Sequence, residues 1–223
     1  MRIERTPTKR RRQGGFTLIE LLTTISIIAV LAAVAGPALN AAMEMAKMSS
    51  AMQKARQIGL GLRAYATDNG GMFPTGENDL GESISTSNAA FRDLYDYIDD
   101  ERIYAVAGSA WGSEADSQDP YCSAGECHFA YVSGLTTTAK SWWPLVTDGS
   151  DGTGTFTRKI GERGGLWKGK KVVVTRIDGS AESVKLKGQG ETRFMPRLDK
   201  PEQNALDVSS YMGSRVEFLD PEG

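Results

Sequence analysis

The segment GGFTLIELLTTISIIAVLAAVAGPAL, residues 14–39, contains a single ionisable side chain, Glu20, within a long apolar run. A helix from Phe16 to Leu39 is roughly 36 Å long at 1.5 Å per residue, which exceeds the roughly 30 Å of a bilayer's hydrocarbon core. This segment therefore predicts a membrane-spanning helix close to the start of the chain.

Basic side chains precede the apolar run and almost none directly follow it. Positively charged flanks remain in the cytoplasm, so the N-terminus is expected there and everything beyond Leu39 on the other side of the membrane. The basic residues are Arg2, Arg5, Lys9, Arg10, Arg11 and Arg12.

The composition limits the classes of function. The chain has 223 residues and a net charge of -2, with 40% hydrophobic and 24% charged residues. These values exclude a disordered chain, a protein with many membrane spans and a nucleic-acid binder that depends on bulk positive charge. The length fits one ordinary globular domain with an appendage.

The small residues Gly14 and Gly15 come before the apolar run. A secretory signal peptide has the opposite order, with the cleavage site after its apolar region. A cut after Gly15 would remove only the basic leader and leave the apolar helix on the mature protein. The alternative is an uncleaved signal anchor.

Glu20 is an unusual residue in such a helix. A carboxylate within a bilayer costs several kcal/mol and commonly has a partner and a function. After a cut behind Gly15, the new α-amino group of Phe16 in a neighbouring subunit could supply the positive charge and set the stagger between subunits. A carboxyl group that is protonated or reaches the headgroups is the simpler alternative.

Residues 14–20, GGFTLIE, resemble the prepilin cleavage and methylation motif of type IV pilins and type II secretion pseudopilins, and the likeness extends over about residues 9–40. The resemblance implies cleavage between Gly15 and Phe16 by a prepilin peptidase and N-methylation of Phe16. It also implies extraction from the membrane into a filament whose core is built from these helices. Residues 62–75, LRAYATDNGGMFPT, resemble the helix end of major pseudopilins.

The helix is expected to continue beyond the membrane as an amphipathic segment over residues 40–68, with a kink or a melted turn at Gly36 and Pro37. Asn69, Gly70 and Gly71 then predict its end. The apolar stripe of this segment, which is expected to pack on a sheet, comprises Met48, Ala51, Met52, Ala55, Ile58, Leu62 and Tyr65.

Residues 69–223 are expected to form a periplasmic α+β head with a small antiparallel sheet, as in the pilin-like fold that the resemblance implies. A short helix is predicted over residues 88–99. Strands are predicted over residues 128–133, 143–147, 170–177 and 180–186, with a type I′ turn at Asp178-Gly179. The sequence leaves the role of residues 189–223 open.

Cys122 and Cys127 are the only cysteines. In an exported domain, two cysteines this close predict a disulfide that closes a small loop. The alternative, a metal site with the adjacent His128, has too few ligands for a typical four-ligand set.

Asp148 and Asp151 lie in a loop rich in Gly, Ser and Thr, whose oxygen atoms are of the type that Ca²⁺ binds. Major pseudopilins resemble this chain in having a calcium loop late in the sequence, but their acidic cluster is missing here. A solvated turn is favoured over a calcium site, and no other cofactor is expected.

No catalytic motif is recognisable, so no enzyme activity is expected. The function indicated is that of a structural subunit of a type II secretion pseudopilus that drives protein export across the outer membrane. Its expected partners are further pseudopilins, a prepilin peptidase, the inner-membrane secretion platform and lipid before assembly, without nucleic acid. The alternatives are a type IV pilin of a surface fibre and a membrane-anchored exported binding domain.

Overall fold

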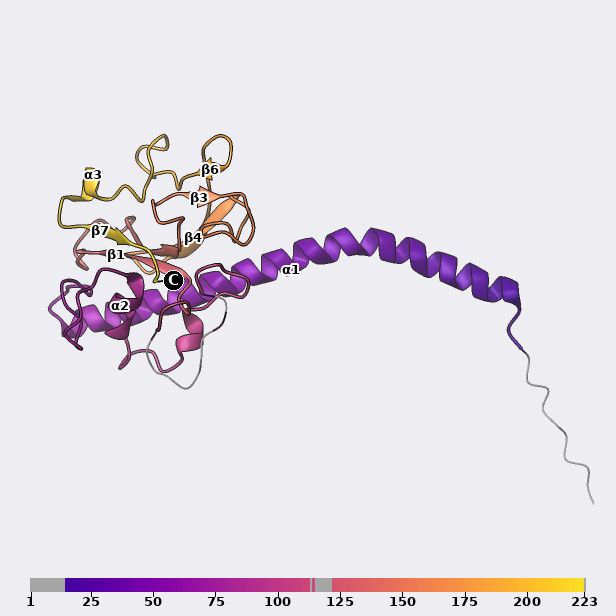
Figure 1. Ribbon diagram of the computed structural model, residues 1–223, viewed down its shortest axis with the longest axis horizontal. Coiled ribbons are helices and arrows are strands. Elements are labelled where there is room, and N and C mark those ends of the chain that lie inside the picture. The colour runs from indigo at the N-terminus through magenta and orange to yellow at the C-terminus, as the bar shows by residue number, and fades with distance from the viewer. Residues whose placement is uncertain (1–14, 113, 115–121, 223) are drawn as a thin grey trace, which may run out of the picture. The chain divides into compact units, whose positions relative to one another are not determined.

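The computed structural model describes residues 15–112, 114 and 122–222 (Figure 1). Its contacts divide the chain into two compact units, Met1–Ala46 and Lys47–Gly223. We call the second unit the head. The head therefore begins within the first helix rather than after it.

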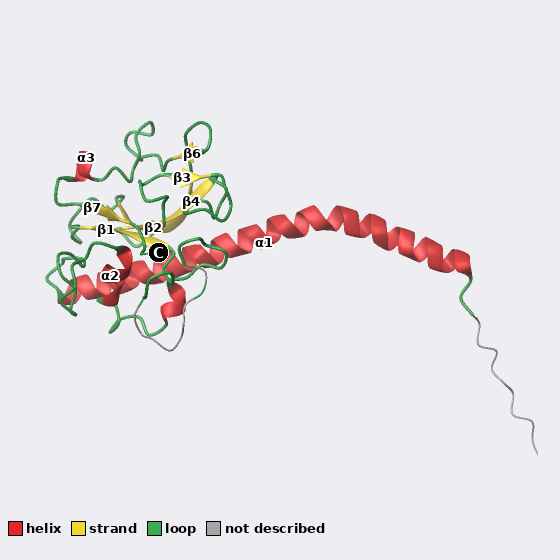
Figure 2. Ribbon diagram, in the orientation of Figure 1, coloured by secondary structure: helices red, strands yellow, loops and turns green. Residues whose placement is uncertain are grey.

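Helix α1, Leu18–Asp68, has 51 residues and belongs to both units (Figure 2). We call residues 18–46 its exposed half and residues 47–68 its core half. The helix is continuous through Gly36 and Pro37, so the melted turn expected there is absent. Pro37 has no amide proton, which leaves the carbonyl group of Ala33 without its usual helical donor.

The core half of α1 presents the predicted apolar stripe to the head. Ala51, Ala55, Ile58 and Leu62 are buried, while Met48, Met52 and Tyr65 are partly buried and pack against the same core. The periodicity of these residues was therefore a correct guide to the buried face.

Glycines allow close packing on two sides of this half. A Cβ atom on Gly59 would lie 2.6 Å from Cγ2 of Thr175, and one on Gly61 would lie 2.6 Å from Cδ1 of Ile98. Both distances are too short for real Cβ contacts. The helix thus needs glycine where the sheet and the segment around Ile98 approach it.

The main sheet has five strands in the order β5-β4-β2-β1-β7. All neighbouring strands are antiparallel, which confirms the α+β class. The strands are β1 (Phe129–Ser133), β2 (Pro144–Asp148), β4 (Lys171–Arg176), β5 (Ala181–Lys185) and β7 (Glu217–Leu219).

The hairpin β4–β5 is confirmed, but its turn differs from the prediction. Gly179 donates its amide proton to the carbonyl group of Arg176 and has φ 83°, and Arg176 donates to the carbonyl group of Ser180. Asp178 does not have the positive φ that a type I′ turn requires. The loop therefore has three residues, 177–179, with glycine in the left-handed position.

A second sheet pairs β3 (Phe156–Thr157) with β6 (Thr192–Arg193). Side chains of β4 alternate between two cores. Val173 joins the core that contains α1, whereas Val172 and Val174 join the core that contains Phe156 of β3. The main sheet therefore separates a layer containing the core half of α1 from a layer containing β3 and β6 (Figure 1).

The segment after α1 begins as predicted. The amide of Asn69 donates to Tyr65 and that of Gly71 to Ala66, while Gly70 and Gly71 have positive φ. These bonds satisfy carbonyl groups at the end of the helix.

Helix α2, Ser87–Arg92, is shorter than the predicted helix over residues 88–99. After α2 the backbone forms turns, in one of which the Tyr97 amide donates a hydrogen bond to the carbonyl group of Leu94. The 3₁₀ helix η1, Glu101–Ile103, follows. Aspartates at positions 93, 96, 99 and 100 disfavour a longer helix, because its C-terminus carries a partial negative charge.

Residues 189–222 form part of the head. They contain β6, the short helix α3 (Ser209–Met212) and β7, which pairs with β1 at the edge of the main sheet. Ser150 donates its amide proton to a carboxylate oxygen of Asp220 at 2.6 Å, which further attaches this segment. Residues 189–222 are therefore folded, and they supply one edge of the main sheet.

Candidate functional site

The exposed half of α1 is the most distinctive surface of the described chain. Its 18-residue apolar window has a mean hydropathy of 2.4 and no buried residue, and α1 is the one described helix long and apolar enough to cross a membrane. Large apolar side chains such as Ile19, Ile28 and Val34 are all exposed. Nothing within the described chain covers this surface.

The start of α1 is fixed by a reciprocal contact between Thr17 and Glu20. The amide and hydroxyl groups of Thr17 donate to Oε2 of Glu20 at 2.9 and 2.8 Å, and the amide of Glu20 donates to the Thr17 hydroxyl at 3.3 Å. This is a capping box, in which each residue satisfies amide protons that the helix itself leaves free. Both Gly15 and Phe16 come immediately before it.

Glu20 therefore has a local role that the sequence interpretation missed, although the spacing Thr-x-x-Glu was its visible signal. The contact uses only Oε2. Among the described residues, no group donates to Oε1, so one carboxylate oxygen remains available to a donor from outside the chain.

Hydroxyl groups in the apolar run bond to their own helix. Thr23, Thr24 and Ser26 donate to the carbonyl groups of Glu20, Leu21 and Leu22 at 3.0, 2.8 and 2.7 Å. Hydroxyl groups satisfied in this way can enter a medium without water at lower cost. This half of α1 is thus compatible with lipid despite its polar residues.

Cys122 and Cys127 are both buried free thiols in the structure, which differs from the expected disulfide. The Cys127 thiol donates to the carbonyl group of Phe129 at 3.3 Å, and the Asn88 amide lies 3.7 Å from Sγ of Cys122. Burial, followed by the hydrogen bond with Cys127, raises the pKa of the Cys122 thiol well above its ordinary value. Both cysteines are therefore part of the core, and the raised pKa favours the protonated, less reactive form of Cys122.

His128 belongs to a buried polar chain rather than to a site with the cysteines. Oγ of Ser109 lies 2.6 Å from Nδ1, and Nε2 lies 2.8 Å from Oδ1 of Asp148. The other oxygen of Asp148 accepts hydrogen bonds from the Trp167 indole at 2.7 Å and from the Val173 amide at 2.6 Å.

These three residue types also occur in hydrolase triads, but the surroundings here differ. His128 is 2% exposed, and the Ser109 oxygen already accepts hydrogen bonds from the amides of Trp111 and Gly112. The adjoining cavity has a volume of about 10 Å³, which is too small for a substrate. The chain of hydrogen bonds instead joins the loop around Ser109 to His128, directly before β1, and then to strands β2 and β4.

The two calcium candidates are not arranged around a common site. Asp148 uses both oxygens in the network just described. The Asp151 carboxylate accepts hydrogen bonds from Thr153 and Thr155 in its own turn, and the two bonds from their hydroxyl groups are each 2.6 Å long. In residues 15–112, 114 and 122–222, no group of three or more His, Cys, Asp or Glu residues could hold a metal ion. These residues therefore do not fit calcium.

Comparisons with known proteins agree with the N-terminal features. Residues 10–36 match the family described as "Prokaryotic N-terminal methylation motif". No solved structure matches the chain.

Three curated relatives carry the same name, "Type II secretion system core protein G". The protein of Aeromonas hydrophila is 30% identical over 112 residues, which is 50% of this chain and 77% of the relative. The protein of Dickeya chrysanthemi is 31% identical over 110 residues, which is 49% of this chain and 71% of the relative. The protein of Pseudomonas aeruginosa is 36% identical over 61 residues, which is 27% of this chain and 43% of the relative.

Three observations indicate the same family. They are the methylation motif, the long apolar helix that packs on an antiparallel sheet, and the similarity to these relatives. This chain belongs to the family of type II secretion system core protein G, a family of structural pseudopilin subunits.

Proposed function

We propose that this chain is a structural subunit of a type II secretion pseudopilus, which assembles through its N-terminal helix and drives protein export across the outer membrane. The observation that carries the proposal is the division of α1 into a half that is core of the head and a half whose apolar side chains have no cover within the described chain. Lipid covers the exposed half before assembly, and further copies cover it afterwards.

Processing prepares the chain for assembly. A prepilin peptidase cuts between Gly15 and Phe16, and the new α-amino group of Phe16 is methylated. The leader and its cut site precede the capping box, so cleavage removes the basic residues without removing Thr17 or Glu20.

Glu20 then determines the stagger between neighbouring subunits. Its Oε2 atom is held by Thr17, and Oε1 faces no donor within the described chain. The positively charged amino group of Phe16 in a neighbouring subunit is a suitable donor for Oε1, since an ammonium group lowers the cost of a carboxylate in an apolar medium.

Topology follows from the charge pattern. The basic leader remains in the cytoplasm, and the head is in the periplasm. The partners in this arrangement are other pseudopilins and the inner-membrane secretion platform.

Intact-mass measurement and N-terminal sequencing, with and without a co-expressed prepilin peptidase, test the processing step. We expect a peptidase-dependent chain that begins at Phe16 and is one methyl group heavier than the sequence alone. Gly15→Leu should block the cut, whereas Gly14→Ala should permit it. A chain that starts at Met1 in the presence of the peptidase would contradict the proposal.

Two substitutions separate the local and intermolecular roles of Glu20. Glu20→Gln keeps a side chain suitable for the capping box but removes the charge, whereas Glu20→Ala removes both. The proposal expects both variants to be processed and neither to form filaments, as judged by electron microscopy of sheared cells. If Glu20→Gln assembles normally, the charge pairing is wrong and capping alone explains the residue.

A further inference from the structure

The head has an apolar groove on the outer side of α1. Its volume is about 480 Å³, and it lies between the core half of α1 and the segment that leads into η1. Its apolar lining includes Leu60, Gly61, Ala64, Tyr97, Ile98 and Ile103.

The groove owes its floor to Gly61, because a larger residue there would collide with Ile98. Its rim is acidic and is formed by Asp99 and Asp100. Arg102 pairs with Asp100 at 2.8 Å, whereas Asp99 has no hydrogen bond or ion pair within the described residues. The groove therefore offers apolar walls next to an unpaired negative charge.

A loop elsewhere in the head has the opposite character. Residues 158–163, Arg-Lys-Ile-Gly-Glu-Arg, follow strand β3 directly, and Ile160 is 68% exposed at their centre. Lys159 pairs with Glu162 and Glu191. Arg158 has no partner among the described residues, so the loop presents an apolar side chain beside a free positive charge.

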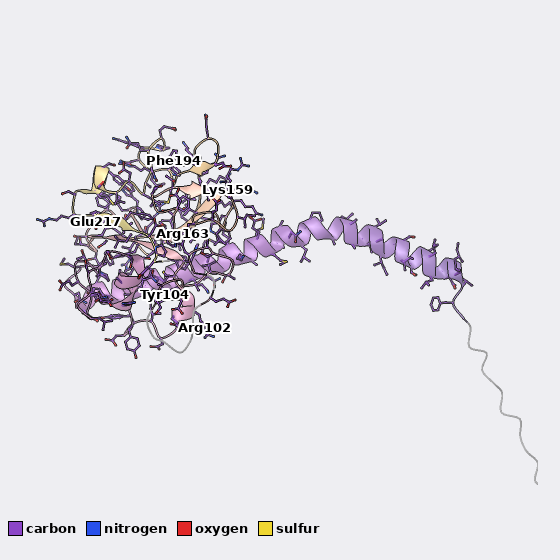
Figure 3. The ribbon with its side chains drawn as sticks, in the orientation of Figure 1. Arg102, Tyr104, Lys159, Arg163, Phe194 and Glu217 are labelled. Atoms are coloured by element: carbon purple, nitrogen blue, oxygen red, sulfur yellow. The ribbon has the colours of Figure 1, made fainter. Side chains whose placement is uncertain are left out.

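The groove and the loop lie in different layers of the head. The groove is on α1, which packs on one face of the main sheet at Thr175, whereas the loop follows β3 in the layer on the other face. Arg102 at the groove and Lys159 on the loop are accordingly far apart in Figure 3. One copy of the head cannot bring the two surfaces together.

We propose that the loop 158–163 of one head docks in this groove of the next head, with Ile160 among Leu60, Ile98 and Ile103 and with Arg158 against Asp99. Two different surfaces of the same chain are then joined head to tail, which is the type of contact that extends into an open helical assembly. This inference rests on the proposed function, because it requires a filament of this chain.

Charge favours this occupant over three other exposed apolar surfaces, namely the exposed half of α1, Leu80 and Leu198. The exposed half of α1 contains no Lys or Arg before Lys47 and so has no counterpart for the acidic rim. Leu80 is exposed but lies between Asp79 and Glu82. Leu198 is 59% exposed, but the adjacent Arg197 is already paired with Asp199 at 2.6 Å. Leu198 is therefore a matched control for Ile160.

Disulfide cross-linking in the processed full-length chain tests the contact. The double variant Leu60→Cys, Ile160→Cys should yield a ladder of covalent multimers under mild oxidation of sheared filaments. A mixture of the two single variants should yield dimers and no ladder, since each chain then has one reactive end. Leu60→Cys, Leu198→Cys and the wild-type chain, with its buried Cys122 and Cys127, should yield neither product.

Charge reversal provides a second test that does not depend on new cysteines. Arg158→Asp and Asp99→Arg should each lower the yield of sheared filaments roughly tenfold, and the combination should restore it. Lys200→Asp, beside Leu198, is the control and should leave the yield unchanged. Thermal unfolding of each variant establishes that its head is folded.

The outcomes distinguish the two proposals. Filaments without the ladder, or charge variants that assemble normally, would overturn the docking contact and leave the pseudopilus subunit in place. Dimers from Ile160→Cys alone would also overturn it, because they indicate a symmetric contact. A wild-type chain that is not processed and forms no filaments would overturn both.

Discussion

The two halves of α1 have the same secondary structure but opposite surroundings. Ile28, in the exposed half, is 64% exposed, whereas Ile58, in the core half, is 0% exposed. The head supplies partners for one half only. A single helix can therefore serve as a core element of its own subunit and as an unfilled packing surface, and the difference lies in the rest of the chain rather than in helix propensity.

The largest expected effect comes from truncating equivalent residues in the two halves. Ile58→Ala should lower the free energy of unfolding of the head by about 2–5 kcal/mol, because it leaves a cavity in the core. Ile28→Ala should leave it unchanged. Tryptophan fluorescence during denaturation in detergent checks both, since Trp111, Trp142, Trp143 and Trp167 all belong to the head. Equal losses in the two variants would contradict the division of the helix.

The glycines sharpen the same comparison. Gly59→Ala forces a Cβ atom against Thr175 and should cost roughly 1–2 kcal/mol after the gain in helix propensity. Gly36→Ala meets nothing within 4 Å, so it should stabilise α1 without changing the unfolding of the head. Denaturation of both variants provides the measurement, and a stabilised head in Gly59→Ala would show that the sheet can move away from the helix.

A third prediction concerns pH and the segment that contacts the core half. Burial raises the pKa of Asp93 to about 6. A hydrogen bond from the Asp79 amide partly opposes this rise, and the negative charge of Asp79 adds to it. The folded head therefore binds a proton more tightly than the unfolded chain. Asp93 therefore makes its full contribution to the free energy of unfolding below the ordinary carboxyl pKa, and this contribution is lost as the pH rises through 6.

Asp93→Asn should remove this dependence. Between pH 4 and pH 7, the wild-type head should lose roughly 1 kcal/mol more than the variant does, once the full effect of the pKa shift is reduced for solvent screening of this half-buried group. Urea denaturation at several pH values measures the difference. Asp96→Asn, at an exposed position of the same segment, is the control and should retain the wild-type slope. Parallel curves for wild type and Asp93→Asn would rule out Asp93 as the titrating group.

The smallest effect is expected at the start of the exposed half. Thr17→Ala removes the capping box and should weaken the first turn of α1 by about 1 kcal/mol. Amide hydrogen exchange in detergent should become severalfold faster at residues 17–20, while the head keeps its unfolding midpoint. Unchanged exchange at these residues would mean that the cap contributes nothing in the micelle.

Features with a strong local signal were predictable from the sequence. The apolar run and the stripe from Ala51 to Leu62 extend over enough residues to predict a helix and its buried face, and the two apolar segments beside Asp178-Gly179 predict the hairpin. The glycine pair after α1 likewise predicts its end. In contrast, β3, β6 and β7 have only two or three residues each, which is too short for any period to be visible.

Features that depend on distant residues were missed. Ser109, His128 and Asp148 are separated by about twenty residues from one to the next, and only the pairing of β1 with β2 brings the last two together. The capping box is local and has a visible signal, the spacing Thr-x-x-Glu, but the sequence interpretation gave Glu20 either an intermolecular partner or a carboxyl group that is protonated or reaches the headgroups. The cysteine spacing could not reveal that both thiols already have hydrogen-bond partners in the core.

The late position of β7 in the chain has a consequence for the order in which the head folds. This strand completes the edge of the main sheet beside β1, some eighty residues upstream, and Asp220 and Glu222 then bond to Ser87 and Asn88. The main sheet therefore lacks this edge strand until residues 217–219 have paired with β1. Contacts of such long sequence separation form slowly. The topology thus makes closure of the head a late step of its folding.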